Sequence, residues 1–395
     1  MNNDTNAPSA LPADAALDAT LQAADTELLN HIHTHTDPTA GLLRIMATTE
    51  AEQEIPRLAG SPDGGPFDSD DDILLPTLRT IGQRMDSTLA QATVTATTVS
   101  AWEQRTLHHA SQYMTAAPRH LLLAVLTDFA EIQHHCGHVQ PIELQRRLRR
   151  IAAKLAGLIG MLLINLGHHQ QAGEFFHTAQ TAADDTGESG LRAWVTVRRA
   201  LVAHYYSDPM EGLLLARQAT DLADNQPCAA RAMAPVTEAR ALARLAQLGR
   251  TDAADAAQRA LARGEQVFPE TNTSEQNDPV FGYTRRQMLF HLGEALAELG
   301  LYSEAETYLT QALELYAPNE QLDRTLIQFD RAYCRASTGN TTEAARLAAH
   351  TTQQLPPEYR TTILRQRARH LETIIRAHDG NTPAIQAFQD VIAML

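Results

Sequence analysis

The chain has 395 residues, of which 44% are apolar but only 5% aromatic, and alanine and leucine dominate the apolar set. Both residues favour helices and β-branched runs are scarce, so the composition favours helix packed on helix over sheet. No apolar run reaches the ~18 residues that a membrane span requires, and MNNDTNAPSA at the N-terminus lacks the features of a signal peptide. The three widely spaced cysteines fit reduced thiols. We therefore expect a cytoplasmic protein without membrane contact.

The charge is concentrated at the N-terminus. Residues 1–72 contain 14 Asp and Glu against two arginines, a net charge of −12, whereas the remaining 323 residues contain 33 acids and 30 bases, a net charge of −3. Lys154 is the sole lysine among 32 bases. This bias fits a high-GC genome, and we expect an actinobacterial source. The alternative is that arginine was selected for two-pronged contacts with anionic groups.

Residues 1–72 are interpreted as an acidic, partly disordered leader. Leucines spaced through 15–31 predict an amphipathic helix, and a short second helix can follow Pro38. Residues 60–72, GSPDGGPFDSDDD, combine glycine, proline and clustered acids, which is typical of a solvated linker. The first domain boundary is therefore placed after residue 72.

Residues 73–145 are predicted to form a helical region ahead of a repeat domain. An apolar stripe over 78–89 predicts its first helix. Further helices are expected from about Thr98 to Met114, from Pro118 and from Pro141, since proline is favoured in the first turn of a helix.

The clearest pattern is QMLFHLGEALAELGLYSEAETYLTQALELYAP at 287–318. It reads as two helices with Gly300 between them, at a turn position that favours a left-handed backbone. Small residues at Gly293, Ala305 and Ala312 allow the two helices to approach closely. This is the tetratricopeptide pattern of about 34 residues. Such a unit leaves one apolar face uncovered and therefore needs neighbouring units.

The rest of 146–395 supplies further candidate pairs, with 267–282 as a long loop before the clear unit. Helices over 360–377 and 383–395 are expected to cap the C-terminal end. The predicted fold is all-α, a right-handed α-solenoid of about five tetratricopeptide-like helix pairs with an N-terminal helical extension. The turns within the pairs are marked by small or turn-forming residues at 167, 208, 249, 300 and 339, a spacing of ~40 residues.

Several segments between Val94 and Leu395 resemble, in order, the sensor region of actinobacterial regulators that join a xenobiotic-response-element-type (XRE) helix-turn-helix to tetratricopeptide-like repeats. The resemblance implies that the repeats bind a peptide, a protein or a small effector and thereby alter gene expression. Few members of that family offer catalytic residues that could be carried over. The segments are TTVSAWEQRTLHHASQYMTAAP, FHTAQTAADDTGESGLRAWV, HYYSDPMEGLLLARQA, RALARLAQLGRTDAA, QMLFHLGEAL, LIQFDRAYCRASTGN and LPPEYRTTILRQRAR.

The DNA-binding head of that family is not recognisable here. DNA binding relies on Lys and Arg that displace counterions from phosphates, whereas residues 1–72 carry −12. A faint helix-turn-helix echo over 77–104 lacks the turn glycine, and the alternative is a plain helical pair that packs on the repeats. We therefore do not expect direct nucleic-acid binding.

Metal or catalytic chemistry has weak support. HHCGH, with His134, His135, Cys136 and His138, could offer metal ligands, but Gly137 is expected to end the helix and no second cluster has zinc-ligand spacing. There is no phosphate-binding loop, nucleophile elbow or separated pair of carboxylates. We expect no cofactor, no metal and no enzymatic activity.

The candidate binding residues lie on the first helix of each pair, because these helices line the concave face of stacked repeats. Arginine and tyrosine are enriched at binding hot spots and suit an acidic or C-terminal carboxylate group. The alternative is that they point to solvent or pair with nearby acids. The candidates are Arg198, Arg199, Tyr205, Tyr206, Arg240, Arg244, Arg286, Phe290, Asp330 and Arg331.

The sequence thus predicts a regulatory or adaptor protein that binds a peptide or protein partner in a concave groove. One alternative is a sensor of a small-molecule effector in a secondary-metabolite pathway. Another is a DNA-binding regulator with a degenerate helix-turn-helix. Homodimerisation through the N-terminal helices and occupation of the groove by the acidic leader stay open.

Overall fold

The computed structural model describes residues 94–395, except 139, 207, 225, 379–381 and 393–394. Val94–Leu395 forms one compact unit, and all regular structure in its described part is helical. The predicted leader 1–72, the stripe 78–89 and most of the helix-turn-helix echo at 77–104 lie outside the described residues.

Three helices precede the first turn of the repeats. They are α4 (Ala96–Gln112), α5 (Pro118–Cys136) and α6 (Ile142–Leu166). The hydroxyl of Thr95 caps α4 by accepting from the backbone N–H of Thr98. The helices predicted from about Thr98, from Pro118 and from Pro141 are confirmed.

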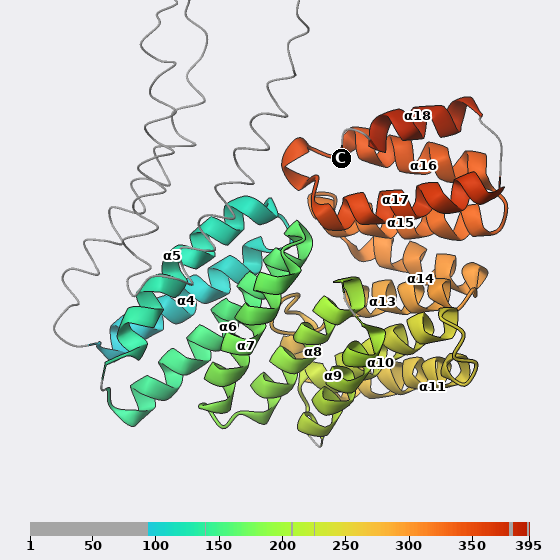
Figure 1. Cartoon of the computed structure of the whole chain (residues 1–395). Helices are drawn as coiled ribbons and strands as arrows, with labels where there is room; N and C mark the ends of the chain where they lie inside the picture. The colour runs from blue at the N-terminus through green and yellow to red at the C-terminus, as the bar shows by residue number, and fades with distance from the viewer. Residues whose placement is uncertain (1–93, 139, 207, 225, 379–381, 393–394) are drawn as a thin grey trace, which may run out of the picture. The chain divides into compact units, whose positions relative to one another are not determined.

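The helices from α6 onward form consecutive antiparallel pairs (Figure 1). Within each pair up to α15/α16, the two helices pack on each other, and first helices of successive units also pack side by side, as α8 does on α10 and α10 on α13. The chain is therefore an α-solenoid. The pairs are α6 with α7 (His169–Asp184), α8 (Ser189–Tyr206) with α9 (Pro209–Leu222), α10 (Ala229–Gln247) with α11 (Ala253–Val267), α13 (Arg285–Glu298) with α14 (Tyr302–Leu315), α15 (Gln321–Ser337) with α16 (Thr341–Gln354), and α17 (Thr362–His378) with α18 (Pro383–Ile392).

Glycines end the first helix of four pairs. Gly167, Gly249, Gly300 and Gly339 have φ between 78° and 91°, the left-handed region where a β-carbon is disfavoured. The remaining marker works differently, because Asp208 caps α9 through its carboxylate and a proline follows at the first helical position. The predicted turn positions are confirmed.

The α13/α14 pair shows why small residues recur. A β-carbon added at Gly293 would lie 2.6 Å from Cγ of Leu309 and 3.2 Å from the carbonyl oxygen of Ala305. Ala305, Leu309 and Ala312 are fully buried against the first helix. Thr284 and Gln287 form a reciprocal capping box at the start of α13. The close helix contact predicted from the sequence is thus confirmed.

The predicted long loop before α13 folds inward. It contains a short 3₁₀ turn, η2 (Phe268–Glu270), and one helical turn, α12 (Thr273–Gln276). Trp194 and Arg198 on α8 both donate to the carbonyl oxygen of Val280, at 3.0 Å each. Gly282 leaves no room for a side chain, since a β-carbon there would lie 1.9 Å from the carbonyl oxygen of Glu275. The sequence indicated the loop but not its burial.

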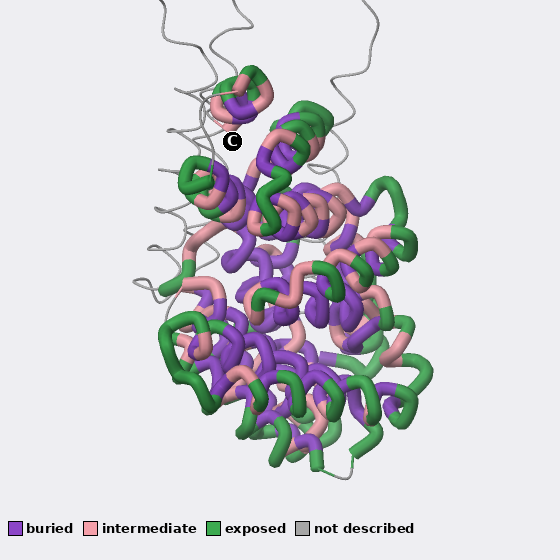
Figure 2. Tube along the Cα trace, turned by 90° about the vertical axis from the view of Figure 1, so that its right-hand side faces the viewer, coloured by how far each residue is buried: buried purple, intermediate pink, exposed green. Residues whose placement is uncertain are grey.

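The last unit contacts the first. Helix α17 packs on α6 as well as on α15. The Tyr359 hydroxyl donates to the carbonyl oxygen of Thr115, and a side chain at Gly167 would overlap Thr362. Buried residues therefore run through the middle of the unit, with exposed residues on the outer helices and turns (Figure 2). The contact between α17 and α6 therefore brings the first and last units together.

We expect Gly293→Ala to destabilise the fold by about 1–3 kcal/mol, because the added methyl overpacks the α13/α14 contact. The matched control is Gly173→Ala in α7, where a β-carbon meets nothing within 4 Å. The control should stabilise by about 0.5–1 kcal/mol through helix propensity. Urea unfolding measures both, and equal stabilisation of both variants would contradict the close contact.

Candidate ligand-binding inner face

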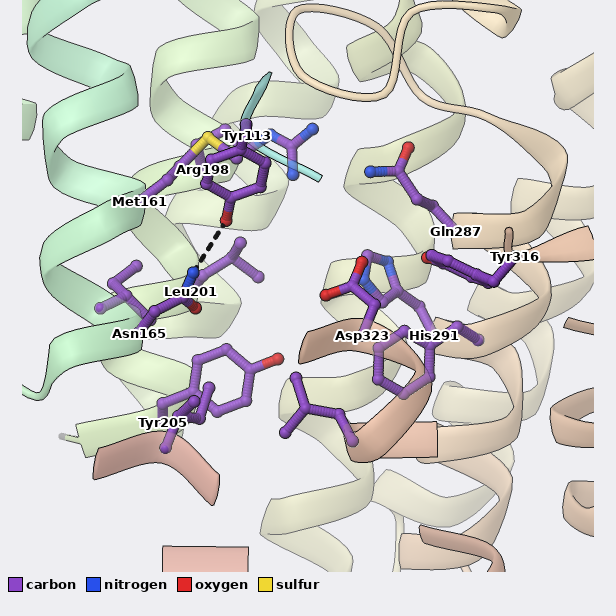
Figure 3. A pocket seen from close by; sticks show the side chains of 14 residues that line it. Tyr113, Met161, Asn165, Arg198, Leu201, Tyr205, Gln287, His291, Tyr316 and Asp323 are labelled. Atoms are coloured by element: carbon purple, nitrogen blue, oxygen red, sulfur yellow. Dashed lines mark hydrogen bonds between the residues drawn. The ribbon is translucent and has the colours of Figure 1, made fainter. Parts of the chain in front are cut away.

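A cavity of about 60 Å³ lies among the first helices (Figure 3). It is lined from α6, α8, α13, α15 and α17 and from the turns after α4 and α14. The solenoid closure therefore brings together residues that are far apart in the sequence. The lining residues are Tyr113, Met161, Ile164, Asn165, Arg198, Leu201, Tyr205, Gln287, Phe290, His291, Tyr316, Asp323, Leu326 and Ile363.

A polar group of the lining lacks full hydrogen bonding within the described chain. Arg198 is 3% exposed and donates to the carbonyls of Val280 and Gly282, but its Nε has no partner among the described residues. Such an atom is costly unless a bound molecule satisfies it. The buried Tyr316 hydroxyl has the Asp323 carboxyl as its hydrogen-bonding neighbour. Figure 3 shows the Tyr205 and Tyr316 hydroxyls turned toward a common space.

Burial sets the protonation of the cavity groups. It raises the pKa of Asp323 to about 6, with nearby Glu320 adding to the effect. It also lowers the pKa of His291 well below its ordinary value, and the nearby Arg240 charge adds to this. His291 is therefore neutral near pH 7, and its Nδ1 lies 3.1 Å from the Tyr283 hydroxyl.

A buried ion network lies one helical turn further along the inner helices. Arg240, with 0% exposure, pairs with Glu294 at 2.7 Å, and Arg367 pairs with both Glu294 and Asp330. The Tyr205 hydroxyl lies 2.7 Å from Arg240 and also lines the cavity. Two guanidinium groups thus balance two carboxylates across α10, α13, α15 and α17.

The two carboxylates of the network differ in proton affinity. Burial raises the pKa of Glu294, but Arg240 and Arg367 outweigh it and hold that pKa well below the ordinary value. Burial raises the pKa of Asp330 to about 7, because Arg367 offsets only part of the cost. Glu294 is therefore the fixed negative charge of the network.

Three or four residues after the network residues, the inner helices approach the solvent. We define the rim cluster as Arg244, Glu298, Tyr333 and His370 from these helices, together with Tyr302 at the start of α14. Arg244 pairs with Glu298 at 3.4 Å and is exposed. Tyr333 stacks on His370 with ring centroids 5.2 Å apart and meets Tyr302 edge-on at 6.0 Å. The cluster combines the exposed side chains of Arg244 and His370 with two half-buried tyrosines.

The ten binding residues predicted from the sequence therefore lie in different parts of the structure. Arg198, Tyr205 and Phe290 line the cavity, and Arg240 and Asp330 belong to the ion network. Arg244 is in the rim cluster.

The other four candidates lie apart from the cavity lining and are bonded within the chain. Tyr206 donates to the carbonyl of Ile164 at 2.5 Å. The three arginines form ion pairs: Arg199 with Glu211 at 4.0 Å, Arg286 with Glu320 at 2.6 Å, and Arg331 with Glu306 at 3.6 Å. These three arginines therefore pair with nearby acids, as the alternative interpretation of the sequence predicted.

Comparison with protein families matches the tetratricopeptide repeat model at residues 287–319. The chain carries a tetratricopeptide repeat. The match covers helices α13 and α14, the pair recognised from its small residues and its turn glycine. A search of curated proteins gives no match.

No helix among the described residues is long and apolar enough to cross a membrane. Within that same part of the chain, no three His, Cys, Asp or Glu residues converge as metal ligands. In the HHCGH segment, His135 packs on Trp102, and a His138 ring nitrogen lies 2.8 Å from the carbonyl of His134.

Sequence reasoning missed four residues that shape the inner face of the tetratricopeptide-like units. Glu294 and Arg367 carry the network, while Tyr316 and Asp323 line the cavity. One signal was available for Glu294, since an acid within the apolar face LFHLGEAL must be buried with a cation. No local pattern identifies Arg367 as that cation, because it arrives from 73 residues away.

Arg367→Ala should destabilise the fold by about 3–5 kcal/mol, because it leaves Glu294 and Asp330 buried with one guanidinium between them. The control is Arg369→Ala, an exposed position on the same helix, with an expected change within about 0.5 kcal/mol. Urea unfolding at pH 8 compares them. Similar stability of the two variants would show that the network is not needed.

Glu298 gives a pH-dependent prediction. Burial raises its pKa from 4.5 to about 7, and Arg244 offsets only part of this. The folded state then holds the proton more tightly than the unfolded chain, so this group lowers stability increasingly as the pH rises from about 4.5 to about 7.

Glu298→Gln should therefore be more stable than the unmodified chain by ~1–3 kcal/mol at pH 8 and nearly equal to it at pH 5. Urea unfolding at the two pH values measures the difference. Glu304→Gln, at an exposed position on α14, is the control and should change neither value. A constant offset between the curves at both pH values would contradict the raised pKa.

Proposed function

We propose that this chain is a regulatory or adaptor repeat protein that binds a peptide or protein partner through the rim cluster. Tetratricopeptide repeats generally mediate interactions between proteins, and stacked helix pairs present extended binding surfaces. The observation that carries the proposal is the rim cluster itself, where Tyr333 stacks on His370 and the Arg244 charge acts on the same His370.

The chemistry of the rim cluster favours a peptide with an acidic or C-terminal carboxylate group. Arg244 is 47% exposed on its side chain and can exchange Glu298 for a ligand carboxylate. That exchange costs little near pH 7, because Glu298 has its pKa raised to about 7 and can take up a proton when it loses the arginine. Tyr333 and His370 add stacked aromatic surface of the kind found at hot spots.

The wider role that we propose is control of transcription or signalling in the cytoplasm of an actinobacterium. This role rests on the sequence segments that resemble the sensor region of XRE-type regulators. The acidic charge of residues 1–72 argues against direct DNA contact. A DNA reader at 77–104 would bind duplex at low salt and lose affinity steeply as salt rises. Absence of binding at low salt would remove that alternative.

Selection from a peptide display library on the purified chain tests the partner site. Enriched peptides should bind in solution by fluorescence anisotropy. Arg244→Glu and Tyr333→Ala should each weaken binding at least tenfold, about 1.4 kcal/mol. The control Arg259→Glu, exposed on the outer helix α11, should leave affinity unchanged.

Two results would contradict the partner site. One is a library without enrichment over many rounds. The other is equal weakening by the control and the rim variants, which would point to a non-specific charge effect. Circular dichroism melts confirm that each variant is folded before its affinity is compared.

A further inference from the structure

The inner cavity has a chemistry that the proposed partner site does not use. One side carries the buried Arg198 guanidinium, and the other carries the Asp323 carboxyl and the Tyr316 hydroxyl (Figure 3). The two charged groups influence each other electrostatically. However, both hydrogen bonds that hold Arg198 go to uncharged carbonyl oxygens. Opposite charges thus face the same small space without being brought into contact.

An unsatisfied polar atom marks this space as built for a polar ligand. The Nε of Arg198 is buried without a partner in the described chain, in a residue that is 3% exposed. A buried guanidinium accepts an anionic group, and a carboxylate accepts a cationic one. A ligand with only one of these charges would leave the opposite protein charge uncompensated in a site of low polarity.

The size of the cavity restricts the ligand further. The cavity volume is about 60 Å³, which admits a small molecule but not several residues of a peptide. Apolar side chains of Leu201, Leu326 and Ile363 complete the wall and suit a small hydrocarbon group. A small molecule that carries an ammonium and a carboxylate a short distance apart, as an α-amino acid does, fits this description.

We propose that the inner cavity binds a small free α-amino acid of the glycine, alanine or serine class. Its carboxylate contacts Arg198, and its ammonium contacts Asp323 and the Tyr316 hydroxyl. The site is separate from the rim cluster, so the inference goes beyond the partner binding proposed above. The bound amino acid supplies the counter-charges that the fold leaves out of the cavity.

Isothermal titration calorimetry of the full chain with glycine, L-alanine and L-serine tests the proposal. Matched single-charge probes are acetate and propionate for the carboxylate, and methylamine and ethylamine for the ammonium. At least one amino acid should bind saturably and raise the melting temperature. Each single-charge analogue should bind at least tenfold more weakly. Absence of saturable binding by all three amino acids, or equal binding of propionate and alanine, would overturn the proposal.

Two variants locate the site. Asp323→Asn removes the counter-charge of the ammonium with little change of shape and should weaken amino-acid binding at least tenfold. Leu201→Trp fills the cavity and should abolish binding. The controls are Asp221→Asn and Leu214→Trp, both at exposed positions on α9. Unchanged amino-acid binding by a folded Asp323→Asn protein would place the ligand elsewhere and overturn the assignment. This conclusion would hold whether or not Leu201→Trp binds the ligand.

The rim variant Arg244→Glu separates this inference from the proposed partner site. It should lose the selected peptide but keep amino-acid binding, whereas Asp323→Asn should do the reverse. Loss of both ligands in both variants would show one shared site and overturn the assignment of two. A crystal structure grown with L-alanine should show its carboxylate against Arg198, and an ordered water in that position would contradict the proposal.

Discussion

The Glu294 carboxylate is buried between Arg240 from α10 and Arg367 from α17, and the arrangement of the inner helices depends on this contact. Removing a charged group from water costs several kcal/mol, and a buried pair offsets that cost only when its geometry is well fixed. Three repeat units must therefore keep a set distance from one another. An apolar contact of the same area would tolerate sliding of one helix past the next, because hydrophobic burial has no direction.

This constraint changes how the solenoid behaves. In an ordinary repeat array each unit contacts its neighbours, and stability is nearly a sum of local terms. Here α17 also contacts α6, and Tyr359 bonds to Thr115 across 244 residues of sequence. The loop before α13 adds a further long-range contact through Val280 and Arg198. The unit therefore combines the local order of a repeat protein with the long-range closure of a globular domain.

The sequence predicted the helix pairs well because their signals are local. Gly300 and Gly339 mark turns by a backbone that other residues avoid, and Gly293 marks a close helix contact. The inner face was predicted less completely. Of the arginines and tyrosines chosen on first helices, Arg198 and Tyr205 line the cavity. Local patterns cannot show which of these charges has a partner within the chain.

The contact between the last and first units of the solenoid determines which of these charged side chains are paired. Arg240 looks in the sequence like an exposed groove residue, yet it is fully buried because Glu294 and Tyr205 face it from neighbouring helices. Arg244, one turn later on the same helix, reaches solvent. Whether an arginine of α10 is buried or exposed depends on which part of the inner face α17 covers. The residue spacing within one helix pair does not reveal the position of α17.

The ion network lies between the inner cavity and the rim cluster. Tyr205 lines the cavity and bonds to Arg240, while Arg244 and Glu298 follow Arg240 and Glu294 by one helical turn. The network is thus the element that cavity and rim share. The net charge of the network depends on Asp330, whose pKa of about 7 leaves that carboxyl partly protonated near neutral pH. A zwitterion adds no net charge to the cavity, so the proposed ligand would leave this proton balance and the arginines of the network undisturbed.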